Sequence, residues 1–189
     1  MTDPRTIRVA PARPDVRMRA GDITGMPRLR PWQPWAALAG FAFLLHFVWE
    51  MLQVPVYAGM IEAAHGSAVR MCTIATVGDA VITLFAYGVM AVATRSRDWL
   101  GHITVGRLAG LVAVGIGMSL VAELLSIHVW QRWQYVAGVP LLAGMGLNVW
   151  LQWLLLPPLT LWLARRHLGL AGRRSPIGPV RPAPDQEIA

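Results

Sequence analysis

Three carboxylic acids and a histidine stand inside long apolar stretches of this sequence, where ionisable side chains are rare. They are Glu50, with His46 one helical turn before it, Asp79 and Glu123. An ionised group at the centre of a bilayer costs at least about 2.5–3.5 kcal/mol, so such residues are functional candidates by default. Three unpaired carboxylates would offset a large share of the about 5–15 kcal/mol that stabilises a typical domain. We therefore expect these acids to be paired, hydrated or protonated, with at least one proton shared among them.

Further polar residues recur at helical spacing in each of the four apolar stretches. Steps of three or four residues place them on one face of each helix. The four polar faces are His46, Glu50, Gln53 and Tyr57; Thr76, Asp79, Thr83 and Tyr87; Ser119, Glu123 and Ser126; and Asn148 and Gln152. Counted at about 1.5 Å per residue, Glu50, Asp79, Glu123 and Asn148 fall at one depth in the outer half of the bilayer, with His46 one turn deeper. The sequence therefore predicts one polar pocket between the helices.

Acid–base work on a lipophilic molecule fits such a pocket. An acid and a base placed together can protonate an alkene and remove a proton elsewhere, which moves a double bond. The cationic intermediate is stabilised by carboxylates and aromatic faces. We expect the proton-transfer groups to be His46, Glu50, Asp79 and Glu123, with a hydrogen-bonded pair between His46 and Glu50. We expect the ligand-binding groups to be Trp49, Gln53, Asn148, Trp150 and Gln152.

Metal chemistry and proton transport are two alternatives. Diiron bundles use Glu-x-x-His motifs, and the spacings His46-x3-Glu50 and Glu123-x4-His128 do not match them. A mononuclear site on His46 and the three acids stays geometrically possible, although we expect no metal or cofactor. A proton relay needs polar groups at both depths, and the inner halves of the stretches are nearly unbroken hydrocarbon.

A further alternative is a non-catalytic accessory subunit of a larger membrane complex. The third stretch carries small residues four apart, Gly106/Gly110 and Ala109/Ala113/Gly117. This spacing lets helix backbones approach closely. We expect it to serve packing inside the bundle, with a homodimer interface as the second possibility. Whether the protein is an enzyme is left open by the residues.

The elements that must position these side chains are transmembrane helices. Of the 189 residues, 55% are hydrophobic and only 14% are charged, an apolar excess too large for an ordinary soluble domain. Each apolar stretch is long enough to cross a hydrocarbon layer of about 30 Å. The first is too long for a signal peptide and contains Glu50. The fold class is all-α, a polytopic four-helix bundle within residues 32–165. The helices are expected at about 35–57, 71–94, 103–127 and 140–162.

The arginines set the expected topology. There is no lysine, and 15 of the 17 arginines lie before the first helix, around the second loop or after the fourth helix. Only Arg70 and Arg132 lie on the other side. The positive-inside rule therefore places both termini in the cytoplasm. We expect residues 1–31 and 166–189 to be disordered arms that meet anionic lipid rather than nucleic acid.

Aromatic residues at the ends of the helices are typical of membrane interfaces. On the cytoplasmic side these are Trp32, Trp35, Trp99 and Trp162. On the outer side they are Tyr57, Trp130, Trp133 and Tyr135.

The sequence resembles the EXPERA family, to which the sterol isomerase known as emopamil-binding protein and the sigma-2 receptor belong. That family has a four-helix core with a His-x3-Glu turn in its first helix, similar to His46-Phe-Val-Trp-Glu50. It places acids on its second and third core helices, similar to Asp79 and Glu123. The resemblance implies that His46 and the acids transfer protons and stabilise a cation, and that the pocket accepts a sterol-like molecule.

The last helix extends this resemblance. An asparagine with a nearby tryptophan is similar to Asn148 and Trp150, although the spacing here is two residues where the family has three, and a later proline is comparable to Pro157. The chain also resembles small bacterial membrane proteins with a Gly-Asp-Ala second helix and a Leu-Gln-Trp…Pro-Pro last helix. In this sequence the Gly-Asp-Ala motif occupies residues 78–80, Leu-Gln-Trp occupies residues 151–153, and Pro-Pro occupies residues 157–158. That second resemblance implies no activity. We expect the protein to lie in the bacterial inner membrane.

Overall fold

The computed structural model describes residues 29–97 and 99–170 and consists mainly of four long helices. They are α1 (Gln33–Leu52), α2 (His65–Ala93), α3 (Val105–Leu124), which continues as a π-helix over Leu125–Val129, and α4 (Leu147–His167). All four are long and apolar enough to cross a membrane. The expected all-α bundle and its multi-pass membrane character are thereby confirmed.

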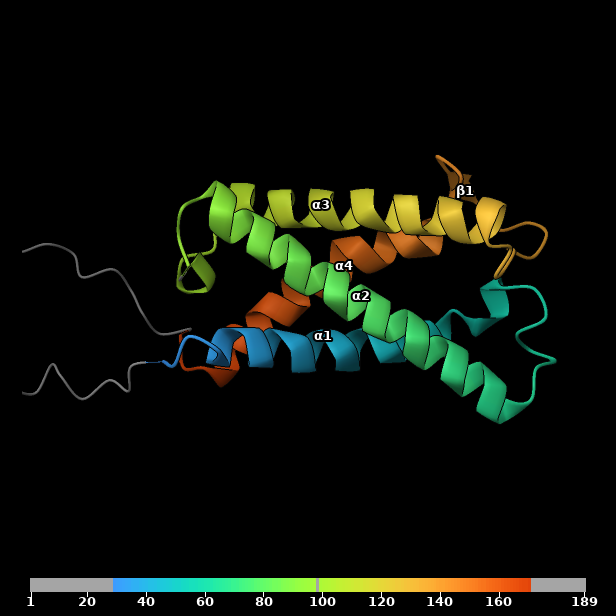
Figure 1. The fold of residues 1–189 in the computed structure, drawn as a ribbon, viewed down its shortest axis with the longest axis horizontal. Coiled ribbons are helices and arrows are strands. Elements are labelled where there is room, and N and C mark those ends of the chain that lie inside the picture. Colours follow the sequence, from blue (N-terminus) through green and yellow to red (C-terminus); the bar gives the residue numbers. More distant parts are fainter. Residues whose placement is uncertain (1–28, 98, 171–189) are drawn as a thin grey trace, which may run out of the picture.

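The helices form a ring in which each packs on two neighbours. α1 contacts α2 and α4, and α3 contacts the same two helices from the opposite side. α2 runs obliquely across the bundle (Figure 1). Its C-terminal end lies beside α3, near the 94–104 connection, and its N-terminal end extends past α1. α2 therefore diverges from α3 toward the end of the bundle where the other two connections lie.

The two ends of the bundle differ in their side chains, and we name them accordingly. The arginine end holds the start of α1, the 94–104 connection and the last turns of α4. The acidic end holds the α1–α2 and α3–α4 connections. Glu50 and Glu123 lie in the last turns of α1 and α3 on this side, and Asp79 lies halfway along α2.

The apolar core of the arginine end is built around aromatic rings. Tyr87 of α2 stacks on Trp99 at a centroid distance of 4.8 Å and meets the edge of Trp35 at 5.0 Å. Leu38 and Leu161 belong to the same buried cluster as Tyr87 and Trp99, whereas Trp35 is partly exposed at its edge. Trp99, expected at the membrane interface, has 0% of its surface exposed and donates its indole N–H to the Tyr87 carbonyl. It belongs to the core because the 94–104 connection folds back under the helices.

The acidic end contains a β-hairpin where the sequence predicted the beginning of the fourth helix. Strands β1 (Leu141–Leu142) and β2 (Met145–Gly146) pair antiparallel across Ala143–Gly144, and both turn residues have positive φ. This two-residue turn matches the twist of a hairpin. The predicted helix from 140 is therefore wrong at its start, and α4 begins at Leu147 instead.

The other helix boundaries also move. α1 ends at Leu52 rather than near 57, because Pro55 lacks the N–H that a continuing helix needs. α2 begins six residues earlier than expected, and α4 continues through Pro157 and Pro158 to His167. The expected tail from residue 166 therefore starts inside a helix. The rest of that tail, at 171–189, and the arm at 1–28 lie outside the described residues.

Some small residues on α3 face the inside of the bundle and others lie on its outer surface. Gly110 packs against the Met90 side chain of α2, as the bundle-packing expectation requires. Ala109, Ala113 and Gly117 are exposed on the surface of α3. Only part of the small-residue pattern therefore serves contacts within this chain.

Candidate functional site

A cavity of about 460 Å³ opens at the acidic end between the diverging helices α2 and α3. This volume lies within the range of about 300–1,000 Å³ that is usual for small-molecule sites. Most of its wall is apolar, with side chains such as Met71, Ile74 and Ile82 from α2. The polar residues that line it are Glu50, Gln53, Tyr57, Cys72, Asp79, Ser119, Glu123, Ser126, Arg132 and Gln152.

Trp153 of α4 packs between α1 and α3 next to this cavity. Its ring is fully buried and lies against α3 at Gly115, so close that a Cβ at that position would overlap the ring. Only glycine allows this approach. The tryptophan therefore packs α4 closely on α3, one residue after Gln152, which lines the cavity.

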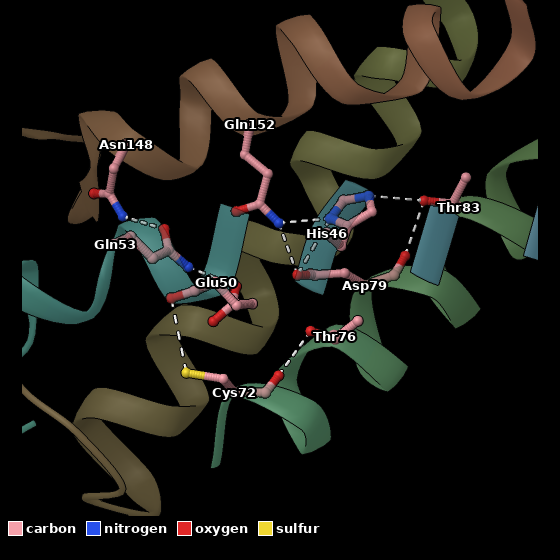
Figure 2. Close-up of polar contacts among 9 residues, drawn as sticks. All are labelled: His46, Glu50, Gln53, Cys72, Thr76, Asp79, Thr83, Asn148 and Gln152. Carbon is pink, nitrogen blue, oxygen red and sulfur yellow. Dashed lines mark hydrogen bonds and ion pairs between the residues drawn. The ribbon is translucent and has the colours of Figure 1, made fainter. Parts of the chain in front are cut away.

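His46, Asp79, Thr83 and Gln152 form one hydrogen-bonded group from three helices, which we call the histidine cluster (Figure 2). The Gln152 Nε2 atom lies 2.7 Å from His46 Nδ1 and 2.7 Å from Asp79 Oδ2. His46 Nδ1 and Asp79 Oδ2 are themselves 3.4 Å apart. The imidazole has no exposed surface, whereas 17% of the Asp79 side chain is exposed. Asp79 is thus the member of this pair that a ligand can touch.

The amide of Gln152 can join the other two helices through one nitrogen atom. The two hydrogens of the Gln152 amide nitrogen can serve Nδ1 and the Asp79 carboxylate together, because both are then acceptors. The N–H of the imidazole then lies on Nε2, 3.4 Å from the Thr83 hydroxyl, which in turn donates to the Asp79 backbone carbonyl.

Glu50 belongs to a second group, which runs along the wall toward the acidic end. Gln53 donates to Glu50 Oε1 at 2.5 Å, and Asn148 donates to Gln53 Oε1 at 2.7 Å (Figure 2). The Cys72 thiol donates to the Glu50 backbone carbonyl at 3.7 Å. The Glu50 carboxyl also lies near enough to Asp79 to interact with it electrostatically. These contacts hold α1, α2 and α4 together around the carboxyl.

Glu123 is held by aromatic donors from the α3–α4 connection. Trp133 Nε1 and the Tyr135 hydroxyl each donate to Glu123 Oε2 at 3.1 Å. The Tyr135 hydroxyl accepts a hydrogen bond from the backbone N–H of Gly146 at 3.0 Å. Burial and the nearby Glu123 carboxylate raise the pKa of Tyr135 above its usual range, so the phenol stays protonated and able to donate. Glu123 thus fixes this connection over the cavity.

The two connections at the acidic end are also joined through their backbones. Tyr57 and Tyr135 form a bridge, in which Ala58 N donates to Gln134 O at 2.9 Å and Val136 N donates to Val56 O at 3.0 Å. The rings of the two tyrosines stack at 5.2 Å. Together these contacts make a small cover over one side of the cavity.

Ser119 differs from the other hydroxyl groups on the polar faces. Thr76 and Thr83 donate to carbonyls one turn back in their own helix. Ser119 lines the cavity with only 3% of its surface exposed, and its Oγ has no hydrogen-bond partner among the described residues. An unpaired buried hydroxyl costs free energy, so this one is a candidate contact for a bound molecule.

The structure brings most of the predicted residues together but changes their partners. Three predicted acids, Gln53 and Gln152 line the cavity, whereas His46, Asn148, Trp49 and Trp150 do not. The expected pair between His46 and Glu50 is wrong, since the described partners of His46 are Asp79, Thr83 and Gln152. Its ring lies toward Asp79 on α2 and Gln152 on α4, because the rotation of the packed helices about their axes does not follow from spacing along one helix.

Trp133, Tyr135 and Arg132 were missed as residues of the site. We interpreted the aromatic segment 130–135 as part of the membrane interface, although it donates to Glu123 and lines the cavity. The only signal for them was the density of hydrogen-bond donors immediately after the third helix. Trp150, by contrast, donates to the Leu142 carbonyl of the hairpin at 3.2 Å.

The acids are not arranged as a metal site. Within residues 29–97 and 99–170, no group of three or more His, Cys, Asp or Glu side chains could hold a metal ion. Comparisons with known proteins add no family: no family model, no curated protein and no solved structure matches the chain.

Proposed function

We propose that this protein binds a lipophilic molecule of isoprenoid or sterol type in the cavity at the acidic end, and that it isomerises this molecule by acid–base chemistry. The observation that carries the proposal is the combination of an apolar wall with three carboxyl groups in one membrane cavity. An apolar wall accepts hydrocarbon, and fixed carboxyl groups orient it or exchange protons with it.

Access from the membrane supports a lipid as the ligand. Ile74 lines the cavity and is also 61% exposed on the surface of α2. Met71 and Gly78, on the same helix, also line the cavity and are exposed on the outer surface of the bundle. A molecule dissolved in the bilayer can therefore enter between α2 and α3 without crossing water.

The proposed reaction moves a double bond without net change in protons. A protonated carboxyl, Asp79 or Glu50, gives its proton to one alkene carbon, and the resulting carbocation loses a proton from a neighbouring carbon to a second carboxylate. Glu123 and the Trp133 ring face the same cavity and stabilise the cation. His46 does not touch the ligand in this scheme and acts as a positioning residue for Asp79. The resemblance to the EXPERA family is consistent with these roles.

The arginine distribution supports an orientation for this site. Arg95, Arg97, Arg107, Arg165 and Arg166 lie at one end of the described bundle. By the positive-inside rule we infer that this end faces the cytoplasm, that both termini are cytoplasmic, and that the cavity opens in the outer leaflet of a bacterial inner membrane.

Mass spectrometry of lipids that co-purify with the protein tests binding. We expect the parent protein to retain an isoprenoid or sterol-type lipid, and Asp79→Asn and Glu50→Gln to retain at least tenfold less. Glu62→Gln is the matched control, because Glu62 is exposed and does not line the cavity. Absence of retained lipid in the parent, or equal retention in all four proteins, would contradict binding.

Deuterium exchange separates binding from catalysis. Incubation of the lipid-loaded protein in D2O should place deuterium in the lipid, because the added and removed protons come from groups that exchange with solvent. Asp79→Asn should abolish this label. Retained lipid without deuterium in the parent protein would limit the function to binding.

An accessory role in a larger complex is the second candidate. The exposed row Ala109, Ala113 and Gly117 on α3 favours it, because such a row allows a second helix to approach closely. Extraction from native membranes in a mild detergent should then yield a larger assembly. A monomer with bound lipid would favour the first candidate.

A further inference from the structure

A second cavity, of about 370 Å³, lies at the arginine end between α3 and α4. Its apolar wall consists of Ile103 and Leu108 near the start of α3 and of Pro158 and Leu161 on α4. Trp162 and Arg165 line the same space. The cavity is therefore an apolar groove with one guanidinium group, and it is separate from the site with the three acids.

Arg165 retains most of its hydrogen-bonding capacity. A guanidinium carries five N–H donors. Among the described residues, the hydrogen bond recorded for this side chain runs from Nη2 to the Gly101 carbonyl at 3.3 Å. This contact fixes the side chain beside the 94–104 connection and leaves other donors for an acceptor from outside the chain.

The electrostatic surroundings of Arg165 favour an anion. Arg95, Arg97, Arg107 and Arg166 lie at the same end. In residues 29–97 and 99–170, no arginine forms an ion pair with a carboxylate. Arg107 instead donates to the His102 carbonyl at 2.8 Å.

We propose that this cavity is a specific site for one anionic phospholipid. The acyl chain lies along the Ile103–Leu108 and Pro158–Leu161 walls, and the phosphate is bound by Arg165. The groove and the lipid match in polarity and in charge. The apolar walls between the helices require a hydrocarbon chain, and the guanidinium group of Arg165 requires a negatively charged group. Basic pockets between transmembrane helices bind anionic headgroups in this way, and arginine binds phosphate oxygens through two parallel N–H donors.

A zwitterionic lipid fits this site less well. Its phosphate could reach Arg165, but its ammonium group would lie among the remaining arginines of the same end. The like charges would oppose binding, whereas a glycerol headgroup adds hydrogen bonds and no positive charge. We therefore expect preference for phosphatidylglycerol over phosphatidylcholine with the same acyl chains.

Arg166 provides a matched control. It neighbours Arg165 on α4, but its guanidinium lies over the ring of Trp162 at 5.8 Å and does not line the cavity. Arg165→Gln and Arg166→Gln remove the same charge from the same turn of helix. A diffuse attraction of the arginine end for anionic membranes would respond equally to both substitutions.

Native mass spectrometry of the purified full chain, titrated with dioleoylphosphatidylglycerol, tests the proposal. We expect one lipid bound to the parent protein, at least about tenfold weaker binding to Arg165→Gln because a charge-assisted contact is lost, and binding within about twofold of the parent for Arg166→Gln. Dioleoylphosphatidylcholine should bind at least tenfold more weakly than the anionic lipid. Circular dichroism before and after heating verifies that the variants are folded.

A second variant acts on the apolar part of the groove. Leu108→Trp fills the space beside the acyl chain and leaves every arginine in place, so it should also weaken binding of the anionic lipid. Equal weakening by Arg165→Gln and Arg166→Gln, equal binding of the two lipids, or binding of soluble glycerol 3-phosphate as tight as that of the lipid would overturn the proposal.

Discussion

The two ends of this bundle use the same four helices in opposite ways. At the arginine end, Tyr87, Trp99 and Leu38 pack into a continuous apolar core, and the indole N–H of Trp99 is satisfied by a backbone carbonyl. At the acidic end the helices diverge around a cavity, and side chains from different helices are joined by hydrogen bonds, as between Gln152 and Asp79. The aromatic core is thus concentrated at one end and the three carboxyl groups at the other.

This division indicates where the stability of the fold resides. Close packing drives helix association in membranes, where lipid offers no hydrophobic advantage, and interhelical hydrogen bonds contribute only about 0.6 kcal/mol each on average. The aromatic core of the arginine end can therefore hold the helices together while the acidic end accommodates the three carboxyl groups. Substitutions in the aromatic core of the arginine end should accordingly affect stability, and substitutions of cavity residues at the acidic end should affect binding of the ligand proposed there.

Of the substitutions that test this difference between the two ends, Trp99→Ala is expected to change the free energy of unfolding most. This substitution removes a fully buried ring that stacks on Tyr87, so the free energy of unfolding should fall by about 3–5 kcal/mol. Unfolding in mixed micelles of mild and denaturing detergent, followed by tryptophan fluorescence, measures the change. Trp32→Ala is the control at the same end, because Trp32 is 58% exposed, and should change stability by less than about 0.5 kcal/mol. Similar losses for the two variants would remove the claim that this end holds the fold together.

A smaller and local effect is expected from Glu123→Gln at the acidic end. The amide is nearly isosteric but uncharged, so the hydrogen bonds from Trp133 and Tyr135 lose their charge-assisted character. Opening of the 130–146 connection should become easier by about 1 kcal/mol. Hydrogen–deuterium exchange of its backbone amides should then be about fivefold faster, with no change in the 94–104 connection. Exchange that accelerates equally at both ends would show that the ends are not energetically separate.

The sequence predicted the features that depend on one helix at a time. The length of each apolar stretch was enough to place four helices, and the three- and four-residue spacing was enough to place Glu50, Asp79 and Glu123 toward one cavity. Relations between helices were not accessible in the same way. Spacing favoured Glu50 as the partner of His46, because the rotation and vertical offset that bring Asp79 and Gln152 to that ring are properties of the packed bundle.

Two other errors have a common physical origin. Leu141, Leu142 and Met145 are as apolar as residues of a membrane helix, so hydropathy did not distinguish the hairpin from a helix start; Gly144 and Gly146 were the only local signals. Trp133 and Tyr135 have both an apolar ring and a hydrogen-bond donor. The same two residues are therefore equally suited to a membrane interface and to a carboxylate, and only the position of Glu123 decides between these roles.

The smallest effect on stability, and the sharpest test of the division, is expected from Ser119→Ala. The Ser119 hydroxyl is buried without a partner among the described residues, so its removal should leave the free energy of unfolding unchanged or raise it slightly. Thr83→Val is the control, because the Thr83 hydroxyl lies 3.4 Å from His46 Nε2 and donates to the Asp79 carbonyl, and its loss should cost about 1 kcal/mol. Lipid retention should change in the other direction: a ligand whose polar atom pairs with Ser119 would be retained about fivefold less by Ser119→Ala. A variant that loses stability together with lipid would make Ser119 a structural residue and remove it from the proposed binding site.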